Sequence, residues 1–209
     1  MKKMEWLLLI FNLIYIAGFS LYYLLQQNYE FMVYIGAMLV LLVAVVILQR
    51  RVRFPHFILW MLSTWGLLHM LGGGLRLPSG IVLYRWIPVE LYNAHDMLGE
   101  FVILKFDQIL HFYIYFVMSF VLAHLLARIV NREIKPLYFY FFVVLGSMGL
   151  SVVNELIEFA AVLAMPSTGV GGYYNTLLDL VFNTMGALVG ALVSYIWHKV
   201  PSVEGIAEN

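Results

Sequence analysis

An acid and a histidine four residues apart open a long apolar segment in the middle of the chain. Asp107 and His111 belong to the run Lys105-Phe106-Asp107-Gln108-Ile109-Leu110-His111-Phe112. On an α-helix this spacing puts both side chains on one face. The residues that follow, up to Ala127, include no Asp, Glu, Lys or Arg. An ionisable pair at the mouth of a lipid-compatible segment could act as an acid–base pair or as metal ligands.

Other apolar segments carry polar groups that could join this pair. The expected catalytic residues are those with ionisable side chains: His111, Asp107, Glu155, Glu158 and Asp179. Residues on the same helix faces or at similar depth are expected to support them: His69, Asn183, Tyr115 and Lys105. The sequence contains no compact metal motif such as His-Glu-x-x-His. The mixture of histidine and carboxylates could still hold a divalent metal ion, with four candidate ligands: His111, Glu155, Glu158 and Asp179.

The composition is that of an integral membrane protein. Hydrophobic residues make up 63% of the chain and charged residues only 11%, whereas soluble domains carry about 25% charged residues. The formal net charge of zero gives no reason to expect a nucleic-acid partner, and membrane lipids are the expected partners. The chain has no cysteine, which excludes disulfides, thiolate catalysis and cysteine metal sites.

The apolar segments predict an all-α bundle of six transmembrane helices, since about 20 residues are needed to cross a bilayer. The expected spans are Trp6–Leu25, Phe31–Leu48, Pro55–Leu75, Asp107–Ala127, Pro136–Met165 and Tyr173–Trp197. We interpret residues 1–209 as a single membrane domain, with two N-terminal spans in residues 1–53 and a four-helix core in residues 54–199. The connector, residues 76–105, is too polar to span; its apolar middle is expected to lie on the interface or to cap the bundle. Residues 200–209 form a polar tail.

The distribution of basic residues predicts the orientation, because lysine and arginine gather in cytoplasmic loops. If the N-terminus is inside, nine of the basic residues lie on the inner side and three on the outer side, the latter being Arg76, Arg85 and Lys105. We therefore expect both termini in the cytoplasm and the protein in the plasma or inner membrane.

Counting residues from the outer end of each span places the polar groups in one layer of the membrane. At a rise of 1.5 Å per residue, the ionisable residues of four spans fall within roughly 15 Å of the outer helix ends. An aspartate near the bilayer centre costs roughly 2.5–3.5 kcal/mol on insertion scales, so several in one layer need compensation. Four carboxylates outnumber the two histidines of the layer. The cluster should therefore carry protons, bind a cation or face a water-filled cavity.

The order of these motifs resembles a known family. The motifs Asp107-x-x-x-His111-Phe112, Glu155-x-x-Glu158 and Asp179-x-x-x-Asn183-x-x-Gly186-Ala187 resemble the YjdF-like bacterial and archaeal membrane proteins, whose function is unknown. More distantly they resemble the VanZ-like proteins, which are linked to glycopeptide-antibiotic resistance. The resemblance implies the fold and the location of a site. Asn175 stands where YjdF-like proteins often carry an acid.

Three functions are compatible with this pattern. The first is an intramembrane enzyme acting on a lipid or lipid-linked envelope substrate from the outer leaflet, with His111 as base or metal ligand, Asp107 orienting it and a glutamate as acid. The second is a proton- or cation-coupled transporter, although six helices without a detectable repeat argue against it. The third is a structural or regulatory membrane protein whose polar residues only set helix packing.

Overall fold

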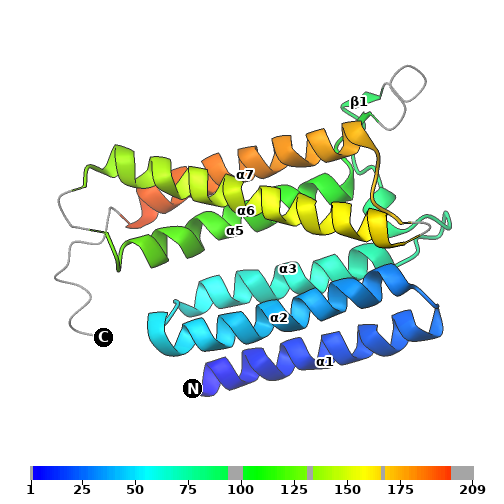
Figure 1. Ribbon diagram of the computed structural model, residues 1–209, viewed down its shortest axis with the longest axis horizontal. Coiled ribbons are helices and arrows are strands. Elements are labelled where there is room, and N and C mark those ends of the chain that lie inside the picture. Colours follow the sequence, from blue (N-terminus) through cyan, green and yellow to red (C-terminus); the bar gives the residue numbers. More distant parts are fainter. Residues whose placement is uncertain (1, 94–100, 131–133, 166–167, 199–209) are drawn as a thin grey trace.

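The protein is a bundle of six long helices joined by short turns and one irregular connector (Figure 1). The computed structural model describes residues 2–93, 101–130, 134–165 and 168–198. Within these ranges six helices are long and apolar enough to cross a membrane, as predicted. They are α1 Lys3–Leu25, α2 Tyr29–Val52, α3 His56–Gly74, α5 Phe106–Leu126, α6 Pro136–Ala164 and α7 Tyr173–His198. The polar tail and Lys199 lie outside the described residues.

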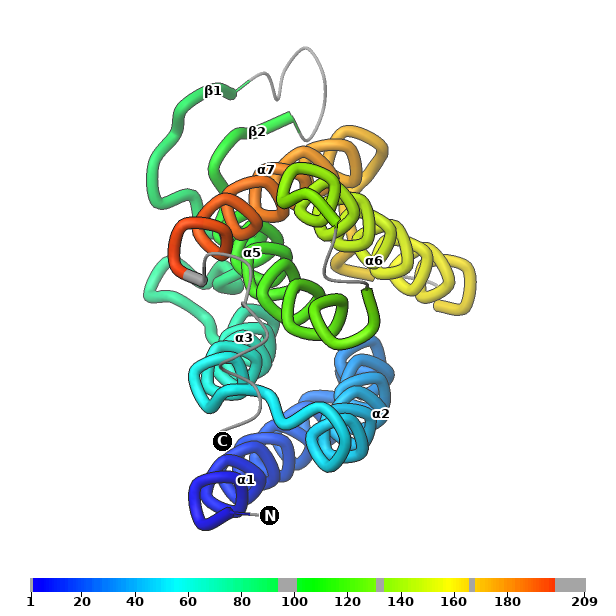
Figure 2. The backbone as a smooth tube through the Cα atoms, turned by 90° about the vertical axis from the view of Figure 1, so that its left-hand side faces the viewer, coloured from blue at the N-terminus to red at the C-terminus, as the bar shows by residue number. Residues whose placement is uncertain are grey.

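Successive helices run in opposite directions, so the connections alternate between the two ends of the bundle (Figure 1). The α1–α2 turn, the connector after α3 and the loop before α7 lie at one end, which we call the connector end. Helix α5 packs against α3, α6 and α7, whereas α2 lies beside α3 and α1 lies on the far side of α3 (Figure 2). The central position of α5 lets two neighbouring helices, α6 and α7, direct side chains at Asp107 and His111.

Close approach of α5 and α7 is made possible by two glycines. A methyl group on Gly186 would overlap the carbonyl oxygen of Phe112, and one on Gly190 would overlap that of Phe116. Ser119 on α5 also donates a hydrogen bond from Oγ to the carbonyl oxygen of Ala187 at 2.9 Å. The spacing Gly186-x-x-x-Gly190 is the pattern of small residues that permits close helix contact in membranes.

The connector folds over one end of the bundle as irregular chain with short elements. These are the 3₁₀ turn η1 Leu83–Arg85 and an antiparallel pair of strands, β1 Tyr92–Asn93 and β2 Val102–Ile103. Its exit into α5 is fixed by the buried side chain of Gln108. The amide oxygen of Gln108 accepts hydrogen bonds from the backbone N–H groups of Leu104 and Lys105, and its nitrogen donates to the carbonyl of Val102.

A small network of neutral polar side chains joins α1 to α3. It includes none of the ionisable residues of the predicted site. The side-chain nitrogen of Asn12 donates to Oγ of Ser63 at 2.7 Å, and the hydroxyl of Tyr15 donates to the amide oxygen of Asn12 at 2.7 Å. We call these three residues the Asn12 network. Every member is satisfied by a protein partner, which is the usual condition of a buried polar group.

Candidate functional site

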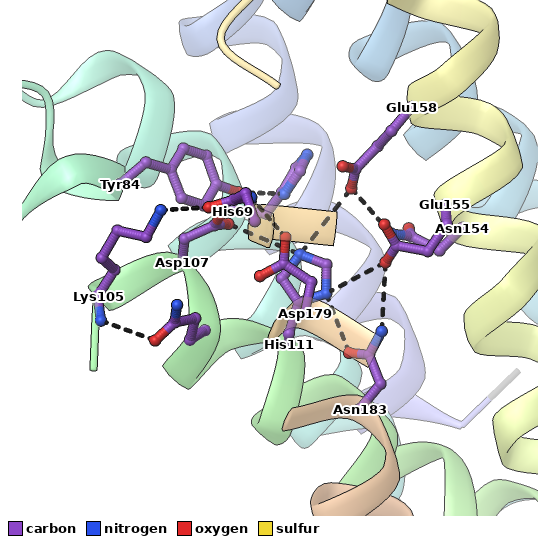
Figure 3. A network of polar contacts seen from close by, with 12 residues as sticks. His69, Tyr84, Lys105, Asp107, His111, Asn154, Glu155, Glu158, Asp179 and Asn183 are labelled. Atoms are coloured by element: carbon purple, nitrogen blue, oxygen red, sulfur yellow. Dashed lines mark hydrogen bonds and ion pairs between the residues drawn. The ribbon is translucent and has the colours of Figure 1, made fainter. Parts of the chain in front are cut away.

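Three helices direct ionisable side chains into one group near the connector end (Figure 3). Helix α5 supplies an acid and a histidine, α6 supplies two acids, and α7 supplies an acid and an amide. We call this group the His–carboxylate cluster: Asp107, His111, Glu155, Glu158, Asp179 and Asn183. The structure thus brings together all five residues predicted to be catalytic, together with Asn183.

His111 is held in place by Asn183 rather than by Asp107. Nδ1 of His111 lies 3.0 Å from the amide oxygen of Asn183. The nearest approach of Asp107 is 3.7 Å, from Oδ1 to Nε2, which is too long for a hydrogen bond. The expectation that Asp107 orients the imidazole is therefore replaced by a different geometry, in which Asp107 faces the opposite ring nitrogen.

The contacts of Asn183 also determine which ring nitrogen carries the hydrogen. Its side-chain nitrogen donates to Oγ of Ser151 at 2.8 Å and to Oε1 of Glu155 at 3.3 Å. Because a carboxylate oxygen accepts hydrogen bonds, the amide nitrogen faces Glu155 and the amide oxygen faces His111. Nδ1 of His111 consequently donates to Asn183, and the lone pair of the neutral ring is at Nε2.

The lone-pair side of His111 faces carboxylates. Nε2 lies 3.7 Å from Oδ1 of Asp107 and 3.9 Å from Oε1 of Glu158. Glu158 is itself fixed by Asn154, whose side-chain nitrogen donates to Oε1 at 2.9 Å. The side chains of Asp107 and Glu158 are 24% and 22% exposed, whereas that of His111 is 10% exposed. A ligand can therefore approach Nε2 from the Asp107–Glu158 side.

Asp179 lies at the closed side of the cluster and is only 1% exposed. Its Oδ2 accepts a hydrogen bond from the side-chain nitrogen of Asn175 at 2.6 Å. The amide oxygen of Asn175 in turn accepts a hydrogen bond from Nζ of Lys105. Lys105 therefore reaches Asp179 through Asn175. Within the described part of the chain, Oδ1 of Asp179 has no hydrogen-bond partner.

His69 lies beside the cluster and is tied to the connector (Figure 3). Burial raises the pKa of Tyr84 well above its ordinary value of 10.0, so this phenol keeps its proton, and its hydroxyl is hydrogen-bonded to Nδ1 of His69. The ring of Tyr84 lies against Gly72, where any Cβ would be 2.7 Å from it. Gly72 belongs to the last turn of α3, and its missing side chain leaves room for this ring.

Tyr115 has the most peripheral place among the predicted supporting residues. Its hydroxyl donates to the carbonyl oxygen of Leu150 on α6 at 3.4 Å, two helical turns beyond Asp107 along α5. Its own carbonyl accepts hydrogen bonds from Ser119 and Ser147. Tyr115 therefore joins α5 to α6 at the inner boundary of the cluster.

Four residues of the site have roles that reasoning from the sequence did not assign: Tyr84, Gln108, Asn154 and Asn175. Asn154 and Asn175 each stand four residues before the acid they contact, which is the helical spacing used to pair Asp107 with His111. The same spacing in the sequence is therefore enough to predict both asparagine contacts. Gln108 and Tyr84 act through the irregular connector, for which no periodic pattern exists.

The fold and the site together define a polytopic α-helical membrane protein with a His–carboxylate cluster near one end of the bundle. The chain belongs to the family described as "Predicted membrane protein (DUF2238)", whose model matches residues 6–200. This match confirms the resemblance to the YjdF-like family, while the resemblance to VanZ-like proteins stays a prediction. No curated protein and no solved structure matches the chain.

Proposed function

We propose that this protein is a membrane enzyme that acts on the headgroup of a lipid or lipid-linked envelope substrate entering from the outer leaflet, with His111 as its general base. The observation that carries the proposal is the orientation of His111. Asn183 occupies Nδ1 and leaves Nε2 facing Asp107 and Glu158 on the partly exposed side of the cluster. A base needs such a free lone pair within reach of a substrate.

A comparison within the same molecule argues against a purely structural role. The Asn12 network joins helices with neutral groups that satisfy one another. The His–carboxylate cluster instead gathers four acids around one histidine and leaves Oδ1 of Asp179 without a hydrogen bond in the described part of the chain. Ionisable side chains are expensive in a membrane and are functional by default. If the cluster only packed helices together, neutral side chains that satisfy one another would do so at a lower free-energy cost.

The geometry supports a hydrolytic step. A water molecule beside Nε2 transfers a proton to His111 as its oxygen attacks an ester or phosphoester bond of the headgroup. That bond breaks, and the leaving oxygen takes a proton from the carboxyl group of Glu158, which is held by Asn154 at the accessible edge. Asp107 stabilises the imidazolium that forms, since it lies on the same side of the ring.

A proton- or cation-coupled carrier is the second candidate. It is favoured by the depth of the carboxylates, which extend from Asp107 at the start of α5 to Glu155, about 14 Å from the end of α6. A carrier would use this series for stepwise transfer of protons or cations. An enzyme changes the chemical composition of its substrate lipids and a carrier does not, so the two proposals make different predictions.

The first prediction concerns three substitutions that keep the shape of the site as far as possible. Glu155→Gln and Asp179→Asn remove a charge, and His111→Ala removes the base. Each variant is expected to remain folded and inserted, because membrane hydrogen bonds average only about 0.6 kcal/mol, but to lose function. The measurement is the lipid and lipid-linked precursor composition of host cells by mass spectrometry, together with envelope integrity or antibiotic sensitivity.

Asn12→Ala is the matched control, since it also deletes a buried polar side chain but lies in the Asn12 network. The control should keep wild-type function. Full function in all three site variants would refute an active role for the cluster. Loss of the phenotype without any change in lipid composition would favour the carrier.

A further inference from the structure

We infer that the cluster contains a binding site for one divalent metal ion, with Asp107, His111 and Asp179 as protein ligands. The inference rests on the proposed function for the location of the working site and refines it: with an ion on Nε2, the base would be a water held by that ion rather than the imidazole itself. Metal binding can be measured without a substrate. One ligand atom from each of these residues lies within 4.8 Å of the other two. Two belong to one face of α5 and the third comes from α7, so the site is formed where these two helices meet.

The first argument is an excess of acceptors. With Nδ1–H engaged by Asn183, the neutral ring of His111 offers only its lone pair at Nε2. That lone pair faces Oδ1 of Asp107, another acceptor, at 3.7 Å. Two acceptors attract each other only through something positive between them. The distance of 3.7 Å is too long for a hydrogen bond through a shared proton. It leaves room for a metal ion bound to both atoms.

The second argument is independent and comes from Asp179. The residue is 1% exposed, and Oδ1 has no hydrogen-bond partner in the described part of the chain. Leaving a buried acceptor unpaired costs roughly 1–3 kcal/mol, and more for a charged group. Lys105 does not remove this cost. It donates to Asn175, which donates in turn to Oδ2 of Asp179 and leaves Oδ1 unpaired. A metal ion at Oδ1 satisfies the orphaned oxygen.

The third argument is the support around each ligand. Metal-binding histidines usually donate their other ring N–H to an oxygen acceptor, and ligating carboxylates are themselves hydrogen-bonded. His111 has such a partner in Asn183, and Asp179 has one in Asn175. Ligands bound at about 2.0–2.2 Å from a zinc ion lie about 3.3–3.6 Å apart in a tetrahedral site. A shift of a few tenths of an ångström would close the observed separation of Nε2 and Asp107.

A competing set of ligands shares His111 with Glu155 and Glu158. Glu155 lies 3.7 Å from Nδ1, on the side already engaged by Asn183. Only Glu158 of this pair approaches Nε2, at 3.9 Å. Glu158 can therefore serve as a fourth ligand at the accessible edge, or that position can hold water. Three protein ligands with one open position are typical of catalytic zinc sites.

The chemistry of the ligands limits the metal. One imidazole with two carboxylates suits transition metals such as Zn²⁺ and Mn²⁺, whereas Mg²⁺ and Ca²⁺ prefer oxygen ligands alone. The experiment uses the full chain, purified into lipid nanodiscs, stripped with chelator and dialysed against Zn²⁺ or Mn²⁺. Bound metal is counted by atomic spectroscopy and its affinity measured by competition with a chromophoric chelator. We expect one ion per chain.

Variants determine which ligands hold the ion. Asp179→Asn and His111→Gln should each weaken metal affinity by more than the 10–100-fold typical of losing an outer-shell partner. Glu155→Gln distinguishes the two ligand sets, since it removes a carboxylate from the Nδ1 side and should keep one ion per chain. Asn12→Ala, outside the cluster, is the matched control and should keep wild-type metal affinity. Gel filtration and thermal unfolding establish that each variant is folded. If Asp179→Asn does not fold, Asp107→Asn tests the same site from its more exposed rim.

Each result has a definite meaning. Wild-type protein that binds no more Zn²⁺ or Mn²⁺ than Asp179→Asn overturns the inference. Equal loss in Glu155→Gln and Asp179→Asn places the ion in the competing set and overturns the site as stated. Absence of metal together with lipid turnover that depends on His111 leaves the proposed function standing alone. One bound ion, with full cellular function in every site variant, sustains the metal site and refutes the enzyme.

Discussion

At the scale of single residues, Asn183 organises the cluster although it carries no charge. One amide accepts from Nδ1 of His111, donates to Ser151 and donates to Glu155. It is completely buried, so none of these contacts competes with solvent. The amide therefore fixes the ring orientation of His111 and separates its two sides, with Glu155 towards Nδ1 and Asp107 and Glu158 towards Nε2.

This arrangement predicts that Asn183→Ala weakens metal binding without removing a ligand. The variant should bind one ion per chain with about 10–100-fold lower affinity, which is the usual cost of losing the partner of a ligating histidine. The measurement is the same chelator competition in nanodiscs. Asn12→Ala, which removes a buried amide from the Asn12 network, should lower thermal stability comparably while keeping wild-type metal affinity. Equal affinity in the two variants would contradict a positioning role for Asn183.

At the scale of helices, the contact between α5 and α7 determines the geometry of the site. Asp107 and His111 belong to α5 and Asp179 and Asn183 to α7, so their distances depend on how closely the two backbones approach. Gly186, one turn beyond Asn183, provides this closeness at Phe112, the residue after His111. The small residue is therefore a positioning element for both the amide contact and the proposed ligand set.

Gly186→Ala should separate the two helices. Its Cβ would overlap the carbonyl oxygen of Phe112, which is backbone and cannot rotate away, and overpacking of this kind costs roughly 1–3 kcal/mol. We expect a lower midpoint of thermal unfolding in detergent and weaker metal binding. Gly149→Ala on α6 is the control, because no atom outside its own helical neighbourhood lies within 4 Å of the added methyl group. A control as damaging as Gly186→Ala would show that helix contact is not the cause.

The helices also show why part of the site could be predicted from the sequence. Apolar runs near 20 residues fixed the six spans, and helical spacing with depth brought Asp107, His111, Glu155 and Asp179 to one layer. The contacts of Asn175 and Asn154 were not predicted, because a neutral amide costs less in a membrane than an ion and so gives a weaker signal. Tyr84 reaches His69 only through the irregular fold of the connector, which has no periodicity to reveal it.

At the scale of the whole molecule, the two ends of the bundle carry different kinds of residues. The connector, the loop before α7 and the His–carboxylate cluster gather at one end (Figures 1 and 3). That loop is anchored to the start of α2, because a carboxylate oxygen of Glu30 accepts a hydrogen bond from the backbone N–H of Gly169 at 2.6 Å. The opposite end carries the basic turns after α2 and α5. Since basic turns face the cytoplasm, the cluster should open towards the outer leaflet.

Cysteine labelling tests this orientation directly, because the chain contains no native cysteine. Ser79→Cys places a thiol on the exposed connector, and Ile129→Cys places one after α5, where the native side chain is 78% exposed. A membrane-impermeant maleimide added to intact cells should label position 79 and leave position 129 unlabelled until the membrane is permeabilised. Both sites are exposed in the structure, so a difference between them reports the side of the membrane and not burial. Labelling of position 129 alone in intact cells would reverse the orientation and move the cluster to the inner leaflet, where an envelope substrate on the outer face could not reach it.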